Sequence, residues 1–265
     1  MDYVAVAKGI GTHKRLGQNF LVNTGIAKAE AEYARGRAAL ELGAGLGALT
    51  KELCAVAKRV VAVEYDKRLF DLLASTLSEK NLELVNADFF EPGTGKFEGA
   101  EIMVSNIPYN LSSKTLAWLG ERDIPAVLCL QKEFVEHMLA EPGTGKYSRL
   151  SVVTKLRFSV HEIMDVPASM FYPRPRVDSK IIYIKPSGAG IDKKSLDTIS
   201  LLMMHKKKKI RNAVIDSSAA MGMSKASAAK LADSLACKDM RAFQMEPDLL
   251  LKTAMKINER TEGTR

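Results

Sequence analysis

The sequence has few cysteines and no long apolar run. Cys54, Cys129 and Cys237 are far apart and form no C-x-x-C pair, so we expect reduced, buried thiols rather than disulfides or a metal site. The four histidines also lack the spacing of metal ligands. No stretch reaches the roughly 18 apolar residues of a membrane-spanning helix, and the N-terminus lacks the order of a secretory signal. We therefore expect a cytoplasmic protein without a metal site or a membrane segment.

Positive charge is in excess, and most of the excess lies near the C-terminus. The net charge is +8, and residues 191–265 carry 15 Lys and Arg against 9 Asp and Glu, a net +6. This asymmetry favours a polyanionic partner, most simply a nucleic acid, although a basic surface that only aids solubility is an alternative.

The first two thirds of the chain alternate short apolar runs with segments of helical periodicity. This alternation is typical of an α/β fold, a mostly parallel sheet with helices on both faces. Helices are expected at 46–57 and 67–78. The seven expected strands are 38–42, 60–64, 82–86, 102–105 and 126–130, followed by 156–160 and 180–184, which should finish the sheet in antiparallel fashion.

The last third of the chain shows no strand signal. Residues 186–190 lack periodicity and are predicted to form a linker. Helices are expected at 194–221, 225–236 and 247–257. We therefore predict an α/β domain over residues 1–185 and a small, basic, all-helical domain over residues 191–265.

A glycine-rich turn follows the first predicted strand. In Glu41-Leu-Gly-Ala-Gly-Leu-Gly47, glycines let the backbone turn tightly and approach a ligand closely. Glu64 comes 21 residues after Gly43, at the end of the next strand, where a carboxylate can accept bonds from both hydroxyls of a ribose. The pattern indicates a nucleoside-containing cofactor, and the spacing alone leaves a nicotinamide dinucleotide as an alternative.

Polar residues stand at three successive strand ends. Glu64, Asp88 and Asn106 should line one crevice at the carboxyl edge of the sheet, where ligands bind in open α/β folds. Each residue taken alone could instead be a strand or helix cap. Asn106-Ile-Pro-Tyr109 follows the strand directly, and Pro108 stops the strand and fixes the backbone there.

Four motifs together resemble a known family. Their order and spacing are similar to the ribosomal RNA adenine N6-dimethyltransferases of the KsgA type, relatives of the erythromycin-resistance methyltransferases, over residues 8–185. The motifs are Leu16-Gly-Gln-Asn-Phe-Leu21, Glu41 to Gly47, Asn106-Ile-Pro-Tyr-Asn110 and Phe171-Tyr-Pro-Arg-Pro-Arg-Val-Asp-Ser179. The resemblance implies a Rossmann-like class I fold and S-adenosylmethionine as the cofactor.

The resemblance also implies roles for individual residues. The implied cofactor contacts are Asn19, Leu21, Gly43, Gly45, Glu64, Asp88 and Asn106. Tyr109 and Phe171 would hold the target base, while the Asn106 side-chain oxygen and the Ile107 carbonyl would accept the hydrogens of its amino group. Pro108 would keep this turn rigid.

Basic residues would hold the RNA. Five cations lie within seven residues in the tail, and we expect them to form a broad positive collar on a helix, with a solvated helix face as the alternative. Two further pairs lie near the N-terminus and beside the supposed base pocket. The predicted RNA contacts are Lys14, Arg15, Arg174, Arg176, Lys206, Lys207, Lys208, Lys209 and Arg211.

The implied function is dimethylation of two adjacent adenosines in a hairpin loop near the 3′ end of small-subunit ribosomal RNA. The partner would be this RNA or a pre-30S particle, and the enzyme would act as a monomer in ribosome biogenesis. A non-catalytic RNA-binding assembly or transcription factor on the same fold is the alternative.

Overall fold

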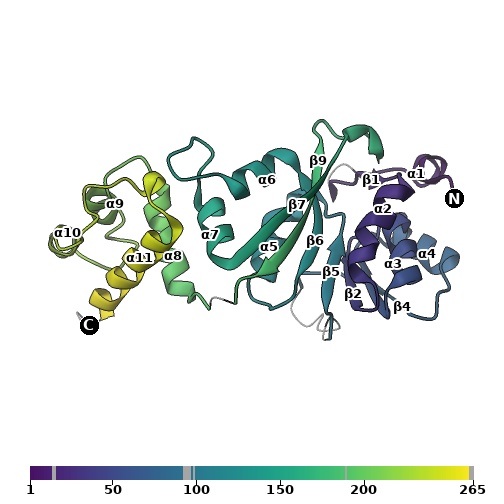
Figure 1. Cartoon of the computed structure of the whole chain (residues 1–265), viewed down its shortest axis with the longest axis horizontal. Helices are drawn as coiled ribbons and strands as arrows, with labels where there is room; N and C mark the ends of the chain where they lie inside the picture. The colour runs from purple at the N-terminus through teal and green to yellow at the C-terminus, as the bar shows by residue number, and fades with distance from the viewer. Residues whose placement is uncertain (14–15, 92–96, 98, 189, 263–265) are drawn as a thin grey trace. The chain divides into compact units, whose positions relative to one another are not determined.

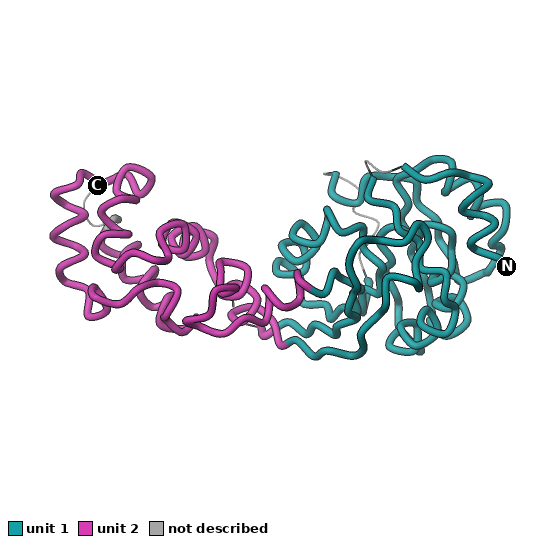
Figure 2. The backbone as a smooth tube through the Cα atoms, turned by 90° about the horizontal axis from the view of Figure 1, so that it is seen from above, with its two compact units in different colours: residues 1–132, 160–186 teal, residues 133–159, 187–265 magenta. Residues whose placement is uncertain are grey.

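The chain forms two compact units, which Figure 2 shows in different colours. Unit 1 comprises Met1–Lys132 and Val160–Pro186, and unit 2 comprises Glu133–Ser159 and Ser187–Arg265. The predicted linker, residues 186–190, coincides with the second passage of the chain from unit 1 into unit 2. Residues 133–159 belong to unit 2 together with the C-terminal helices. The computed structural model describes residues 1–262 except 14–15, 92–96, 98 and 189.

Unit 1 is built on a seven-stranded sheet (Figure 1). Five neighbouring strands of this sheet pair in parallel, and β9 (Ser179–Pro186) runs antiparallel to β6 (Ala126–Gln131), which confirms the predicted Rossmann-like sheet. The strand order reverses between β2 and β5, which makes this the position where open α/β sheets bind ligands. In spatial order the strands are β4 (Leu82–Asn86), β3 (Arg59–Glu64), β2 (Ala38–Leu42), β5 (Ile102–Ser105), β6 (Ala126–Gln131), β9 (Ser179–Pro186) and β7 (Phe158–Val166).

The strand predicted at 156–160 begins later than expected. Residues 156 and 157 end helix α7 (Arg149–Arg157), and β7 starts at Phe158. A capping box formed by Ser148 and Ser151 starts α7. Val152 and Leu156 lie four residues apart on its buried face, so helical packing decides the conformation of Leu156.

Short polar caps start the helices that flank the sheet. Asn23 accepts a bond from the backbone N–H of Ile26 at 3.0 Å, and Asp66 accepts one from Arg68 at 3.1 Å. In Figure 1, α2, α3 and α4 lie together beside β2 and β4. The helices of unit 1 are α1 (Tyr3–Ile10), α2 (Thr24–Ala31), α3 (Ala48–Val56), α4 (Lys67–Thr76) and α5 (Ser112–Leu119), with short 3-10 turns η2 (Glu32–Ala34), η3 (Tyr109–Leu111) and η4 (Ala168–Met170).

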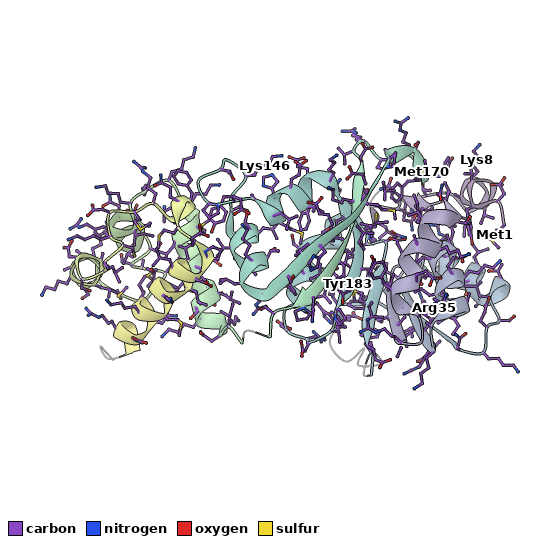
Figure 3. The ribbon with its side chains drawn as sticks, in the orientation of Figure 1. Met1, Lys8, Arg35, Lys146, Met170 and Tyr183 are labelled. Atoms are coloured by element: carbon purple, nitrogen blue, oxygen red, sulfur yellow. The ribbon has the colours of Figure 1, made fainter. Side chains whose placement is uncertain are left out.

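Side chains along the sheet differ in exposure from its parallel centre to its antiparallel end. Val60, Ile102 and Val104 are fully buried in the core of unit 1. Tyr183 on β9, which is labelled in Figure 3, is only partly buried. Its ring stacks on that of the exposed Tyr33, with ring centroids 5.7 Å apart. The antiparallel end of the sheet is therefore less completely covered than its parallel centre.

Unit 2 is helical and has a core of its own. The Tyr147 side chain is fully buried, and its hydroxyl donates to the carbonyl of Met245 at 2.9 Å. Every element described within residues 187–262 is helical, as predicted for the tail. The helices of unit 2 are most of α6 (Lys132–Leu139), α7, α8 (Lys193–Met204), α9 (Ile210–Asp216), α10 (Lys225–Asp233) and α11 (Pro247–Glu262), with the 3-10 turn η5 (Ala242–Gln244).

The single helix predicted at 194–221 is wrong. The chain forms α8 and α9 there, and the lysine run lies in the turn between them. Tertiary pairing replaces the helical hydrogen bonds, because the N–H of Phe243 donates to the Lys206 carbonyl at 3.1 Å and the N–H of Ile210 donates to the Met240 carbonyl at 2.8 Å. Ile210 is fully buried by this arrangement.

Within the described part of the chain, no helix combines enough length and apolar character to cross a membrane.

Candidate functional site

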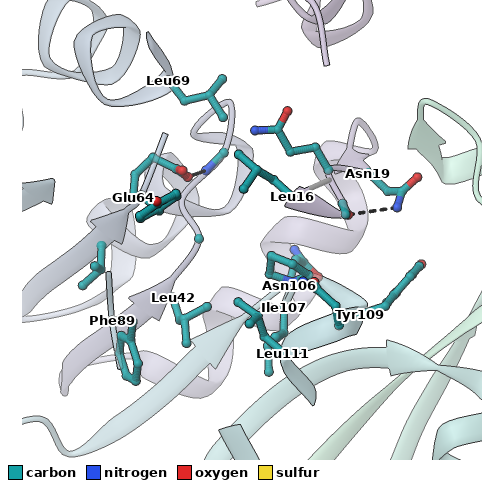
Figure 4. Close-up of a pocket in the computed structure, with 18 of the residues that line it drawn as sticks. Leu16, Asn19, Leu42, Glu64, Leu69, Phe89, Asn106, Ile107, Tyr109 and Leu111 are labelled. Atoms are coloured by element: carbon teal, nitrogen blue, oxygen red, sulfur yellow. Dashed lines mark hydrogen bonds between the residues drawn. The ribbon is translucent and has the colours of Figure 1, made fainter. Parts of the chain in front are cut away.

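A pocket opens at the carboxyl ends of the parallel strands of unit 1 (Figure 4). Its lining includes Gly43 and Gly45 after β2, Glu64 at the end of β3, Asp88 after β4 and Asn106 after β5. The structure therefore brings together, in one pocket, the residues that the sequence placed at successive strand ends. These strands flank the reversal of strand order between β2 and β5.

The glycine turn leaves no room for side chains. Gly45 has φ 59°, and a Cβ atom there would lie 3.1 Å from the ring of Phe20. At Gly47, with φ 80°, a Cβ would lie 2.7 Å from Leu73 on α4. Glycine is therefore required both by the left-handed backbone and by the close packing of the turn.

Glu64 is fixed by the backbone of this turn. Its Oε2 accepts the N–H of Gly45 and its Oε1 accepts the N–H of Asp66, each at 2.8 Å. Burial raises the pKa of Glu64, and these backbone hydrogen bonds oppose the rise. Because a carboxylate oxygen can accept more than one hydrogen bond, the held carboxylate keeps capacity for the hydroxyls of a ligand.

Aromatic side chains form the wall next to Asp88. Phe89 and Phe90 follow Asp88 directly and line the pocket, and Asp88 Oδ1 accepts the N–H of Phe90 at 2.9 Å. Lys114 Nζ lies 5.1 Å from the centre of the Phe90 ring. A flat apolar wall beside a carboxylate suits a purine. We did not predict these two phenylalanines, although their position directly after a strand end was a usable signal.

Asn106 has one end of its amide paired and the other unpaired. Its Nδ2 donates to Oε2 of the buried Glu30 at 3.1 Å. Its Oδ1 is buried and has no hydrogen-bond partner among the described residues. Leaving a buried acceptor unsatisfied typically costs about 1–3 kcal/mol. This oxygen is therefore available to a donor that a ligand brings into the pocket.

Tyr109 is anchored at its hydroxyl. The Tyr109 hydroxyl and Ser179 Oγ are 2.7 Å apart and hydrogen bonded. Burial raises the pKa of Tyr109 to about 12, with the Ser179 hydrogen bond opposing the rise. The phenol is therefore neutral at physiological pH and offers the pocket a ring face rather than a base.

The segment before β1 (Phe20–Leu21) covers one side of the pocket. Asn19 lines the pocket and donates from Nδ2 to the Gly17 carbonyl at 3.1 Å (Figure 4). Gln18 donates to Asp66 Oδ2 at 2.9 Å. Leu21 does not belong to the lining and packs instead in the core of unit 1.

A short ribbon connects this cover with the second aromatic motif. β1 pairs antiparallel with β8 (Phe171–Tyr172), so that Leu21 is opposite Phe171. Phe171 lines the pocket, as do Ile107, Pro108 and Tyr109. The peptide bond between Tyr172 and Pro173 is cis. Apart from Leu21, the residues predicted to hold a base and those predicted to hold a cofactor thus share one pocket.

The predicted RNA-binding residues have varied surroundings. Lys14 and Arg15 lie outside the described residues. Arg174 and Arg176 are exposed and do not line the pocket.

In the lysine run, most side chains already have partners. Lys206 Nζ is 2.5 Å from the Tyr147 carbonyl. Three of the other four cations pair with carboxylates. These pairs are Lys208–Asp216 at 2.7 Å, Lys209–Asp239 at 2.8 Å and Arg211–Asp233 at 2.7 Å.

The site contains no cluster for a metal ion. Across the residues with described positions, no group of three or more His, Cys, Asp and Glu side chains is arranged to hold one. The polar side chains of the lining are instead two carboxylates, four amides, a lysine and two tyrosines: Glu64, Asp88, Gln18, Asn19, Asn106, Asn110, Lys114, Tyr65 and Tyr109.

The fold and this pocket define a class I S-adenosylmethionine-dependent methyltransferase. A crystal structure of a dimethyladenosine transferase from Plasmodium falciparum aligns with a TM-score of 0.75 and 25% identity, over 90% of this chain and 97% of that chain. The 23S rRNA methyltransferase ErmE aligns with a TM-score of 0.58 and 25% identity, over 91% of this chain and 100% of that chain.

Sequence comparison identifies the family. Residues 10–246 match the family described as ribosomal RNA adenine dimethylase, and the chain belongs to this family. It is 40% identical over 225 residues to the "Probable ribosomal RNA small subunit methyltransferase A" of Methanopyrus kandleri, covering 81% of this chain and 80% of that protein. The protein is therefore an enzyme that methylates adenine in ribosomal RNA, and the resemblance drawn from the four motifs is confirmed.

Proposed function

We propose that this enzyme dimethylates N6 of two adjacent adenosines in a hairpin loop near the 3′ end of small-subunit ribosomal RNA, in the free RNA or in a pre-30S particle. The similarity to small-subunit methyltransferases supports the choice of RNA. The observation that carries the proposal is the unpaired Asn106 Oδ1 beside the aromatic rings of Tyr109 and Phe171. We further propose that it acts as a monomer in the cytoplasm during ribosome biogenesis.

The lining of the pocket fits S-adenosylmethionine. The fixed Glu64 carboxylate would accept the ribose hydroxyls, and Asp88 with Phe89 would hold the adenine ring. Gly43 and Gly45 let the backbone approach the ligand, and Asn19 with its neighbours would cover the methionine end. When bound, S-adenosylmethionine supplies an electrophilic methyl group.

The other side of the pocket would act on the target adenine. Its amino nitrogen is a poor nucleophile because the lone pair is delocalised into the ring. Asn106 Oδ1 and the Ile107 carbonyl would accept its two hydrogens and favour a pyramidal nitrogen. Tyr109 would stack on the base, an interaction typically worth about 1–3 kcal/mol. Alignment of the reacting atoms by these groups can lower a barrier by about 7–11 kcal/mol.

This chemistry requires no strong base. The nitrogen becomes positively charged as it is alkylated, so that its proton is readily lost to water. The raised pKa of Tyr109 agrees with this view, because a neutral phenol is not a base at physiological pH. A second methylation would need one remaining hydrogen, which Asn106 Oδ1 or the Ile107 carbonyl can accept.

The test is methylation of small-subunit RNA with isotopically labelled cofactor, followed by mass spectrometry of the nucleosides. We expect labelled N6,N6-dimethyladenosine at two adjacent positions of one hairpin loop. The Asn106→Ala variant should lower the transfer rate at least about 100-fold, comparable to the loss of one transition-state hydrogen bond in other enzymes. RNA affinity should stay within about threefold in equilibrium binding, since stacking and phosphate contacts remain.

Four outcomes would contradict the proposal. Labelled methyl groups elsewhere in the RNA, or only single methylation at saturation, would reject the proposed product. Unchanged turnover of Asn106→Ala would reject the proposed mechanism, and absence of transfer by the wild type with intact RNA binding would favour a non-catalytic assembly factor.

A further inference from the structure

Glu30 is a buried carboxyl group directly behind the site. It lies on α2, is 1% exposed, and does not line the pocket. Its Oε2 accepts Nδ2 of Asn106 at 3.1 Å, and its Oε1 has no hydrogen-bond partner in the part of the chain that is described. The other buried residues of α2 are Ala27 and Ala31. An apolar side chain would satisfy this packing, so the carboxyl needs another explanation.

The explanation lies in the two ends of the Asn106 amide. The amide oxygen can only accept a hydrogen bond and the amide nitrogen can only donate one. The amino group of adenine is a donor, so it needs the oxygen of Asn106. If the amide turned over, Nδ2 would face the amino group, and two donors would oppose each other. Whatever binds the far end of the amide therefore decides which end meets the substrate.

We propose that Glu30 is a positioning residue for methyl transfer: its ionised carboxylate binds Nδ2 of Asn106 and thereby leaves Oδ1 as the acceptor for the adenine amino group. An ionised carboxylate only accepts, so it can bind only Nδ2. A protonated carboxyl can instead donate to Oδ1, which turns the amide over and presents Nδ2 to the substrate. The inference rests on the function proposed above and adds to it a residue outside the pocket.

The electrostatic surroundings place this ionisation near physiological pH. Burial raises the pKa of Glu30 to about 8, and the Asn106 hydrogen bond opposes the rise. The titratable groups that interact with Glu30 are Glu41 on β2 and Cys129 on β6. Burial raises the pKa of Glu41 to about 8, with the charges of Glu30 and Glu64 adding to the rise. Because like charges disfavour each other's ionisation, we expect removal of Glu41 to lower the pKa of Glu30.

Single-turnover methylation rates measured between about pH 6 and 9 test the inference. In the wild type we expect the rate to fall about tenfold for each pH unit below the pKa of Glu30. Glu30→Gln keeps an acceptor but does not titrate, so this fall should disappear. Glu41→Gln is the matched control, a second buried carboxyl that does not contact Asn106. It should keep the fall and move it to lower pH.

A second variant removes the acceptor altogether. Glu30→Leu should lower the rate at least about tenfold at every pH while cofactor and RNA affinities stay within about threefold, because the amide then has no fixed orientation. Wild-type rates in Glu30→Leu, or an unchanged acid fall in Glu30→Gln, would overturn the inference. If Glu30→Leu fails to fold, the pH profile of Glu30→Gln decides alone.

An experiment without catalysis separates this inference from the proposed function. The side-chain amide signal of Asn106 in ¹⁵N-labelled protein, assigned by its loss in Asn106→Ala, should shift with pH in the wild type and stay constant in Glu30→Gln. A shift of this signal with no methylation of any RNA would reject the function alone. A constant signal in the wild type would reject the role of Glu30 even where methylation proceeds.

Discussion

At the scale of single residues, the site depends on side chains held in place by neighbours, most of which lie outside the pocket. Ser179 holds the hydroxyl of Tyr109, and Glu30 holds the amide of Asn106. The backbone amides of Gly45 and Asp66 hold Glu64. Groups fixed in this way need little reorganisation when a ligand binds, which is the usual source of electrostatic catalysis.

Two substitutions of Tyr109 distinguish the contribution of its ring from that of its hydroxyl. Tyr109→Ala should lower kcat/KM for RNA by about 5- to 150-fold, which corresponds to a stacking energy of about 1–3 kcal/mol. Tyr109→Phe is the matched control and should stay within about threefold, because the ring remains and the hydroxyl contacts Ser179 rather than the base. Steady-state kinetics with a hairpin RNA measure both variants, and an unaffected Tyr109→Ala would exclude stacking on this ring.

The sequence predicted some of these residues and not others. Glu64, Asp88 and Asn106 were predictable because strand ends of a parallel sheet meet at one edge. Glu30 was not, since an acidic residue in an amphipathic helix is normally exposed, and its burial depends on where α2 packs. Leu21 was expected to contact the cofactor, but its side chain belongs to the core.

At the scale of elements, the turn between α8 and α9 concentrates positive charge on one short stretch. Its cations form exposed pairs with Asp216, Asp239 and Asp233. Such pairs contribute only about 0–1 kcal/mol each, so RNA phosphates can compete with the carboxylates. A turn also directs neighbouring lysines outward without the spacing restrictions of a helix.

Neutralising this turn should weaken RNA binding and its dependence on salt. We expect the triple substitution of Lys207, Lys208 and Lys209 by Gln to reduce the slope of log affinity against log salt by about 0.7–0.9 per lost phosphate contact. Cofactor affinity should not change. The control is the same substitution at three other exposed lysines of unit 2, Lys225, Lys230 and Lys256. Equal slopes for the two triple variants would remove the turn from the RNA-binding surface.

The limits of sequence prediction at this scale follow from tertiary contacts. The parallel strands were predictable because each is a continuous apolar run between turns. The turn at Lys206 was not predictable, because its backbone groups form hydrogen bonds with residues 238–243, which lie about 30 residues further along the chain. The start of β7 was missed because Leu156 fits either a strand or the buried face of α7, and only the core of unit 2 decides.

At the scale of the whole molecule, two buried carboxyl groups connect stability to pH. The pKa values of Glu30 and Glu41 rise from an ordinary 4.5 to about 8 in the folded protein, mainly because burial disfavours their charged forms. Between these values the folded protein binds more protons than the unfolded chain. The stabilisation is therefore complete below about pH 4.5 and is lost as the pH rises through about 8.

The free energy of unfolding should accordingly fall between about pH 5 and 8.5, by up to about 4 kcal/mol for each carboxyl. Glu30→Gln and Glu41→Gln should each make this fall smaller, as measured by chemical denaturation at several pH values. The exposed Glu259→Gln serves as the control and should behave as the wild type. Parallel curves for all four proteins would show that neither buried carboxyl titrates on unfolding.

The two-residue ribbon of β1 and β8 has a consequence for the order of events at the site. β1 carries Phe20, which lies next to the glycine turn on the proposed cofactor side of the pocket. β8 carries Phe171 on the proposed adenine side, so the pairing of β1 with β8 connects the two compartments of the pocket. A shift of either strand must move its partner. Occupancy of one compartment should then alter the affinity of the other, and by the same factor whichever ligand arrives first.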